Sequence, residues 1–170
     1  MSYLPCELHC HTIHSDGDFT VSELQKAAAD DHLAIIALTD HNTFSGWDEL
    51  DDNIIPAIRG IEWTTYFGHM LVLGANDFVD WRDAQPDNID EKIKQVKAVG
   101  GIVGIAHPYQ LGSPLCTGGR WEFNVRDWRN VDYIEVWHQN LYSAKRENER
   151  ALELWTSLLD RGYKIAATYG

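Results

Sequence analysis

The chain has 170 residues, 44% of them hydrophobic and seven of them tryptophan, which suits one globular domain with a buried core. The formal net charge of -12 repels nucleic acid phosphates and argues against non-specific duplex binding. Three cysteines without framework spacing favour a reducing cytoplasm over a disulfide scaffold, and we expect neither a signal peptide nor a membrane span.

Strands and helices are predicted to alternate along the chain. A short strand at residues 5–11 leads into the helix "SELQKAAADD", where Ser22 could cap the helix and Thr20 with Glu23 form a plausible capping box. "AIIALTD" is continuously apolar, as buried parallel strands are. Further strands are predicted in "NIIPAIRGIEW", "HMLVLGA", "GIVGIAHP", "DYIEVW" and "KIAATY", and helices in "DNIDEKIKQVKAVGG" and "SAKRENERALELWTSLLDRG". This alternation predicts an α/β domain with a parallel sheet, either open or curled into a barrel.

Polar side chains gather where these strands end, which in barrels of this kind is the active-site side. His9 and His11 would point to the same face of a strand and Cys10 to the other. By itself this pair is a weak signal, and two surface or core histidines explain it equally well. The accumulation of further ligands suited to zinc, manganese or iron favours a metal site: Asp16, His41, Glu62, His69 and His107.

The chain resembles the PHP (polymerase and histidinol phosphatase) family of metal-dependent phosphoesterases in "HCHTIHSDG", "ALTDHN", "GIEWTT", "GHMLVLG", "GIVGIAHP" and "IEVWHQN". The resemblance implies a distorted seven-stranded β/α barrel with two or three divalent metal ions at the carboxyl ends of its strands. "GIEWTTYFGHMLVLG" is most similar to a branch that includes carbamate and other ester hydrolases. The implied ligand sets are His9, His11 and Glu62 for one ion, Glu62, His69 and His107 for a second, and Asp16 with His41 for a third.

The sequence departs from the family pattern at its end. The family closes its site with an Asp-x-His motif, and here "KIAATYG" stops at Gly170, where that motif should begin. We therefore expect residues 1–170 to be a PHP-like metallohydrolase domain that lacks its last segment. A protein that is complete at this length would bind fewer metals or borrow ligands.

The expected reaction is attack on a phosphoester by a hydroxide that bridges two metals. Asp40 is a candidate for proton transfer or for orienting the hydroxide, and His138 could protonate the leaving group or be structural. Arg120, in a loop with two glycines, is the candidate for gripping an anionic group. Glu135 could face the metal site or be an ordinary buried carboxylate, and His14 could support the site or have no role.

The leading hypothesis is a phosphoesterase that acts on a small-molecule phosphomonoester or nucleotide, without duplex nucleic acid or membrane as partner. One alternative is hydrolysis of a carboxyl or carbamate ester at the same site. The other is a non-catalytic module that is held together by metals.

Overall fold

The chain forms an α/β fold whose seven-stranded sheet has its strands in chain order, β1 to β7. The computed structural model describes residues 4–112, 118–138 and 144–170, and the chain divides into two compact units, Met1–Glu62 and Trp63–Gly170. Strand β3 (Ala57–Thr65) begins in the first unit and ends in the second. The predicted class and number of strands are confirmed.

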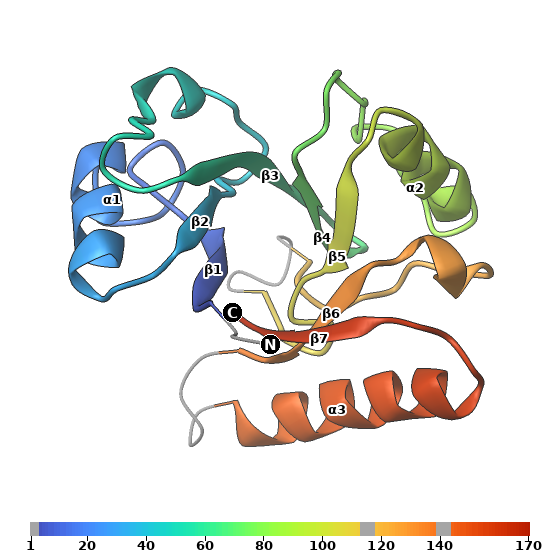
Figure 1. Cartoon of the computed structure of the whole chain (residues 1–170). Helices are drawn as coiled ribbons and strands as arrows, with labels where there is room; N and C mark the ends of the chain where they lie inside the picture. The colour runs from blue at the N-terminus through green and yellow to red at the C-terminus, as the bar shows by residue number, and fades with distance from the viewer. Residues whose placement is uncertain (1–3, 113–117, 139–143) are drawn as a thin grey trace. The chain divides into compact units, whose positions relative to one another are not determined.

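The first unit is built from parallel strands with one helix between the first two (Figure 1). Strand β1 (Cys6–Cys10) pairs with β2 (Ile35–Leu38), which pairs with the start of β3. Helix α1 (Val21–Asp30) packs apolar side chains on β2, and a single-turn 3-10 helix, η1 (Trp47–Glu49), precedes β3. The small core here contains Ala28, Ile36 and Ile55, with Leu24, Leu33, Ile54 and Ala57 packed against them.

Helix α1 begins through the predicted capping box. The Thr20 hydroxyl accepts a hydrogen bond from the Glu23 backbone N–H, and the Glu23 carboxylate accepts one from the Thr20 backbone N–H. These two bonds satisfy donors at the start of the helix that have no partner within it. Thr20 is therefore the cap, and the alternative of Ser22 is wrong.

The second unit continues the sheet through the end of β3 and four more strands. The bounds are β4 Gly68–Leu73, β5 Ile102–Ile105, β6 Tyr133–Trp137 and β7 Ala166–Tyr169, with helices α2 Ile89–Ala98 and α3 Lys145–Asp160 and the 3-10 helix η3 Trp128–Asn130. Strands β5, β6 and β7 pair in parallel, but β4 is antiparallel to β5. The expectation of a parallel sheet is therefore wrong at β4. Only two residues connect β3 to β4, whereas the connection between two parallel strands needs a dozen or more.

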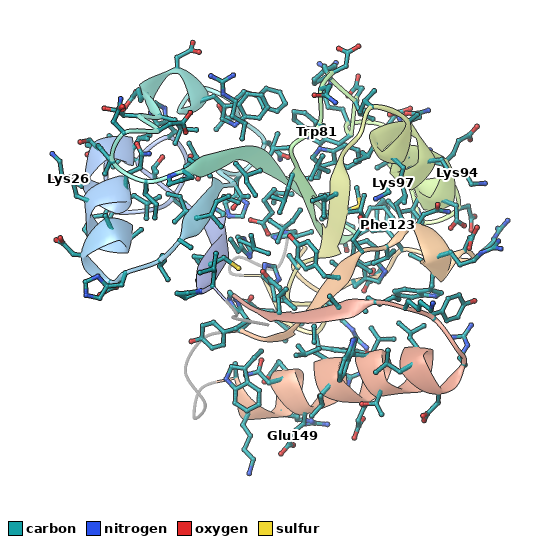
Figure 2. All side chains as sticks on the ribbon, in the orientation of Figure 1. Lys26, Trp81, Lys94, Lys97, Phe123 and Glu149 are labelled. Atoms are coloured by element: carbon teal, nitrogen blue, oxygen red, sulfur yellow. The ribbon has the colours of Figure 1, made fainter. Side chains whose placement is uncertain are left out.

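Helix α2 is fixed to the sheet by a charged contact. The Lys97 ammonium lies 2.7 Å from the Asp132 carboxylate, which also accepts a hydrogen bond from the Val103 backbone N–H at the start of β5. Figure 2 shows Lys97 and Lys94 on different sides of α2.

Among the described residues, no helix combines the length and apolar character needed to cross a bilayer.

We predict that Gly104→Ala destabilises the second unit. A Cβ atom at position 104 would lie 2.0 Å from the ring of Tyr133, which is 3% exposed on the neighbouring strand. Overpacking of this kind costs about 1–3 kcal/mol. Thermal unfolding should show a lower Tm than for Ile102→Val, a change at an exposed position of the same strand. Equal melting temperatures for the two variants would contradict this packing.

Candidate metal centre

The centre of the first unit is the carboxylate of Glu62, which is completely buried. Three imidazole nitrogens face its Oε2 atom: His9 Nε2 at 3.1 Å, His11 Nε2 at 3.2 Å and His41 Nδ1 at 2.9 Å. The four side chains come from the end of β1, the residue directly after it, the segment after β2 and the middle of β3. The structure thus brings together four of the seven predicted metal ligands around one oxygen atom.

Backbone pairing holds His41 beside Glu62. Beyond the end of β2, the Glu62 N–H donates to the carbonyl of Asp40, and the Asn42 N–H donates to the carbonyl of Glu62. These bonds continue the parallel ladder between β2 and β3 past the last residue of β2. The imidazole and the carboxylate therefore meet because the strands pair in this register.

Asp16 extends the cluster toward solvent. Its carboxylate lies 3.3 Å from His11 Nδ1 and 3.4 Å from His41 Nε2, and its side chain is 67% exposed. The loop that carries Asp16 folds back so closely that a Cβ atom on Gly17 would lie 2.3 Å from the carbonyl oxygen of His11. Only glycine fits at that position. One potential ligand atom from each of His11, Asp16 and His41 lies within 4.8 Å of the others.

Asp40 is buried, and both of its carboxylate oxygens accept hydrogen bonds from the loop after β1. Oδ1 accepts from the Thr12 N–H at 2.8 Å and from the Ser15 hydroxyl at 2.6 Å, and Oδ2 accepts from the Thr12 hydroxyl at 2.8 Å. These contacts fix the segment that carries His11 and Asp16. They favour a positioning role for Asp40, and its part in proton transfer stays a prediction.

The electrostatics of the cluster favour positive charge. Burial disfavours the charged imidazole of His41, but the hydrogen bond and negative charge of Glu62, with the charge of Asp16, outweigh it and raise the pKa of His41. A buried carboxylate costs free energy unless a positive group compensates it. The cluster therefore fits a divalent cation, and imidazole with carboxylate is a donor set of zinc, manganese and iron sites.

The two described cysteines do not belong to this donor set. Cys10 is buried on the other side of β1, and burial, with the charges of Glu7 and Asp40, raises the pKa of its thiol. Its conversion to the thiolate that binds metals is thereby disfavoured. Cys6, by contrast, is exposed to solvent.

Three histidine rings form a row in the second unit. The His69 and His107 ring centroids are 5.1 Å apart, and those of His107 and His138 are 4.7 Å apart. Glu135 is 1% exposed and accepts a hydrogen bond from the His107 N–H at 2.8 Å. The sharing of an ion by Glu62, His69 and His107 stays a prediction.

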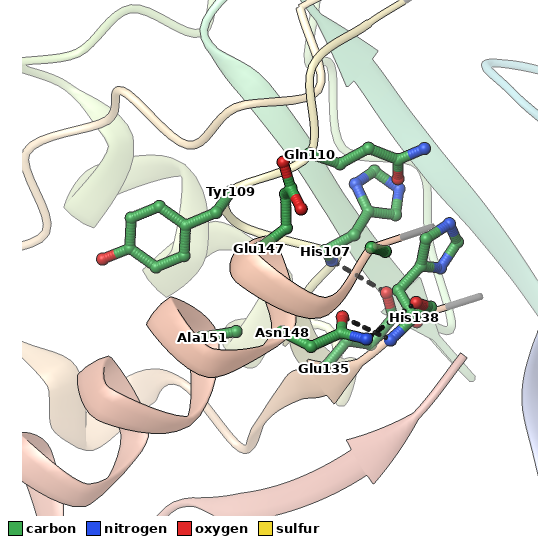
Figure 3. A pocket seen from close by; sticks show the side chains of 9 residues that line it. His107, Tyr109, Gln110, Glu135, His138, Glu147, Asn148 and Ala151 are labelled. Atoms are coloured by element: carbon green, nitrogen blue, oxygen red, sulfur yellow. Dashed lines mark hydrogen bonds between the residues drawn. The ribbon is translucent and has the colours of Figure 1, made fainter. Parts of the chain in front are cut away.

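The positions of His107 and His138 are fixed by contacts that sequence reasoning missed. His107 has a φ of 24°, a strained backbone conformation for a residue with a side chain, and such strain is common at functional sites. The amide side chain of Asn148 in α3 bonds both the N–H and the carbonyl of His138. Figure 3 shows His107, Glu135, His138 and Asn148 around one small space. An asparagine on a helix face gives no sequence signal for such a role.

Arg120 is not among the residues that line the small space around His107 and His138. It lines a cavity of about 210 Å³ whose other lining residues are Tyr109, Leu111, Arg146, Glu147 and Arg150.

His14 makes two side-chain contacts in the first unit, with Ser45 at 2.8 Å and with Glu49 at 2.9 Å. These contacts connect the turn after β1 to η1, so His14 has a structural role.

Comparisons with known proteins bear on the family and the fold of the chain. A family profile described as the PHP domain matches residues 7–103, more than half of the chain. Two uncharacterised proteins of Methanocaldococcus jannaschii are similar. MJ1295 is 28% identical over 109 residues, which cover 64% of this chain and 48% of MJ1295. MJ1587 is 29% identical over 153 residues, with coverage of 81% of this chain and 85% of MJ1587. The chain thus spans about half the length of MJ1295.

Three solved structures share the fold. A protein of Bifidobacterium adolescentis named as a metal-dependent phosphoesterase has a TM-score of 0.66 and 19% identity, covering 99% of this chain and 87% of that one. A two-domain protein of Bacteroides vulgatus is named as containing a PHP-like metal-dependent phosphoesterase. It has a TM-score of 0.66 and 20% identity, and the match covers 96% of this chain and 52% of that one. An amidohydrolase of Chromobacterium violaceum, with bound sulfate and no metal, has a TM-score of 0.62 and 18% identity, and the match covers 97% of this chain and 86% of that one.

Asp40→Asn distinguishes a positioning role of Asp40 from proton transfer. The amide replaces one hydrogen-bond acceptor by a donor, so the loop carrying His11 and Asp16 should loosen and zinc affinity should fall about 10- to 100-fold. Zinc titration calorimetry measures the change, with Asp52→Asn, at an exposed position, as the matched control. Unchanged zinc affinity together with lost turnover would instead support proton transfer.

The raised pKa of His41 predicts a pH-dependent stability of the chelator-treated protein. The contact of His41 with Glu62 stabilises the folded protein fully at pH values below the pKa of a histidine in the unfolded chain, about 6.5. This stabilisation is lost as the pH rises through the higher pKa that His41 has in the folded protein. The difference in unfolding free energy between the protein and His41→Gln should therefore shrink above about pH 6.5 in denaturant titrations. His32→Gln, at an exposed position, is the control. A difference that grows with pH would contradict the raised pKa.

Proposed function

Because the chain belongs to the PHP domain family, we propose that it is a metal-dependent hydrolase that cleaves phosphoesters of small molecules. The observation that carries the proposal is the convergence of three imidazole nitrogens within 3.2 Å of the Glu62 carboxylate. Two structures with the same fold bear names that assign them metal-dependent phosphoesterase activity by prediction, and these names support the proposal.

The cation ligands proposed in the first unit are the residues around Glu62. His9, His11 and Glu62 would hold one ion, and Asp16 with His41 would hold another. Bound divalent cations supply activated water for the attack and offset the charge that builds on the phosphoryl oxygens. Of the metals that suit these donors, zinc and manganese are our first expectations.

The reaction replaces one bond to phosphorus by another. The water oxygen bonds to phosphorus, the bond from phosphorus to the leaving oxygen breaks, and the leaving oxygen takes up a proton. His138 is the proposed donor of that proton, because its ring contacts His107 and its backbone is held on both sides by Asn148. Arg120 is proposed to hold an anionic group of the substrate.

A second candidate is hydrolysis of a carboxylic amide or ester at the same site. The Chromobacterium violaceum protein of the same fold is named an amidohydrolase, and its bound sulfate has the shape and charge of a phosphate group. Both reactions need an activated water and a stabilised oxyanion. The two are separated by comparing turnover of p-nitrophenyl phosphate with turnover of p-nitrophenyl acetate.

We place the protein in the cytoplasm. The described cysteines, exposed Cys6 and buried Cys10, are both free thiols, which agrees with a reducing compartment. The acidic chain is expected to act on a small molecule without help from duplex nucleic acid or a membrane.

The proposal is tested with chelator-treated and metal-reloaded protein on p-nitrophenyl phosphate and a panel of phosphomonoesters. Zinc or manganese should restore turnover, and Glu62→Gln should lower both turnover and bound metal, because it removes the charge that faces the three imidazoles. The matched control is Glu153→Gln at an exposed position of α3.

Three outcomes decide the assay. Metal-dependent release of phosphate that is lost only in Glu62→Gln supports the proposal. Turnover that survives complete metal removal contradicts it. Bound metal without turnover of any ester supports the non-catalytic module instead.

A further inference from the structure

An arginine-lined cavity in the second unit contains Arg120 together with two arginines, Arg146 and Arg150, that have no role in the activity as described so far. We call it the arginine cavity, and it has a volume of about 210 Å³. One water molecule needs roughly 10–15 Å³ of such space, so a group as large as phosphate fits with room for water. Its lining residues are Tyr109, Leu111, Arg120, Arg146, Glu147 and Arg150.

The charge of the cavity is opposite to that of the chain. Three arginines and one glutamate line it, whereas the whole chain has a formal net charge of -12. Arginine keeps its charge at any physiological pH, and its planar fork matches the oxygen atoms of phosphate and carboxylate groups. A positive cavity in an acidic protein selects anions from solution.

The three cavity arginines differ from Arg82 and Arg129 in their pairing. Arg82 and Arg129 each lie 2.7 Å from an aspartate carboxylate. For Arg120, Arg146 and Arg150, by contrast, the structure records no ion pair with any described residue. These guanidinium groups are therefore available to an anionic ligand.

The arrangement of these arginines is also pre-organised. Arg146 and Arg150 are one turn apart on α3, so they share a face of the helix, where two like charges repel each other. The guanidinium carbon of Arg150 lies 4.1 Å from the ring centroid of Tyr109, a cation-π contact that restricts the side chain. A bound anion would offset the repulsion without the cost of ordering Arg150.

The arginine cavity adjoins the histidines of the second unit. Tyr109 and Glu147 line both the arginine cavity and the small space against His107 and His138. In Figure 3, Tyr109 and Glu147 lie on one side of that space, and the rings of His107 and His138 lie on the other. The side chains of Tyr109 and Glu147 thus form part of the wall of both spaces.

We propose that the arginine cavity binds a second anionic group of the substrate, a phosphate or carboxylate that is not cleaved. The preferred substrates are then phosphoesters with a further anionic group beyond the scissile ester. This inference rests on the proposed function for the reaction, but the cavity and its arginines are observed independently of it.

Kinetics with three matched substrates test the inference: a propanediol bisphosphate, a phosphorylated hydroxypropionate and propyl phosphate. Propyl phosphate lacks the second anionic group. In Arg146→Gln/Arg150→Gln, the ratio of kcat/KM for the better doubly anionic substrate to that for propyl phosphate should fall at least about tenfold, the effect expected when a charged hydrogen bond is lost. Which doubly anionic substrate loses more identifies phosphate or carboxylate as the second group.

The control variant is Arg161→Gln. Arg161 follows the same helix and also lies over a tyrosine ring, that of Tyr163 at 5.2 Å, but it does not line the arginine cavity. It should leave the ratio of kcat/KM values unchanged. An equal change in both variants would mean a general charge effect and would overturn the inference.

Binding to metal-free protein tests the cavity without catalysis. Inorganic phosphate and acetate are titrated while the arginine side-chain N–H signals are followed by NMR. The preferred anion should shift the signals of Arg146 and Arg150, and its Kd should rise at least about tenfold in Arg146→Gln/Arg150→Gln. Binding of neither anion, or binding that does not depend on these arginines, overturns the inference even if phosphoesters are hydrolysed. Arginine-dependent binding without any ester turnover supports the anion site and removes the proposed function.

Discussion

The burial of one carboxylate, that of Glu62, is the constraint on which the first unit depends. A negative charge without water around it is unfavourable unless positive or hydrogen-bonding groups surround it. Here three imidazole nitrogens surround it, and the pairing of β2 with β3 brings one of them, that of His41, into place. The fold thus maintains a concentration of donor atoms that is stable only with protons or cations present, which is the physical basis of a metal centre.

The polar contacts behind this cluster determine how well its geometry is kept. Asp40 accepts three hydrogen bonds from Thr12 and Ser15, and Gly17 permits the close return of the loop. None of these four residues is among the groups that face Glu62. They hold the backbone that carries His11 and Asp16, and metal sites need such support as much as they need ligands.

The two units, each taken by itself, contain different chemical groups. The first concentrates carboxylate and imidazole groups that attract cations. The second combines a row of imidazoles, which can transfer protons, with guanidinium groups that attract anions.

The sequence by itself determined the features that depend on neighbours in the chain. The capping box of Thr20 with Glu23, the alternation of strands and helices, and the motifs that indicated a metal site are all local patterns. Only the tertiary structure decided that β4 runs antiparallel to β5 and that Asp40 supports a loop. It also joined Arg120 to Arg146 and Arg150 in one cavity. Such contacts link residues that are far apart in the sequence. They are determined by strand register and helix packing, and neither of these leaves a periodic signal in the sequence.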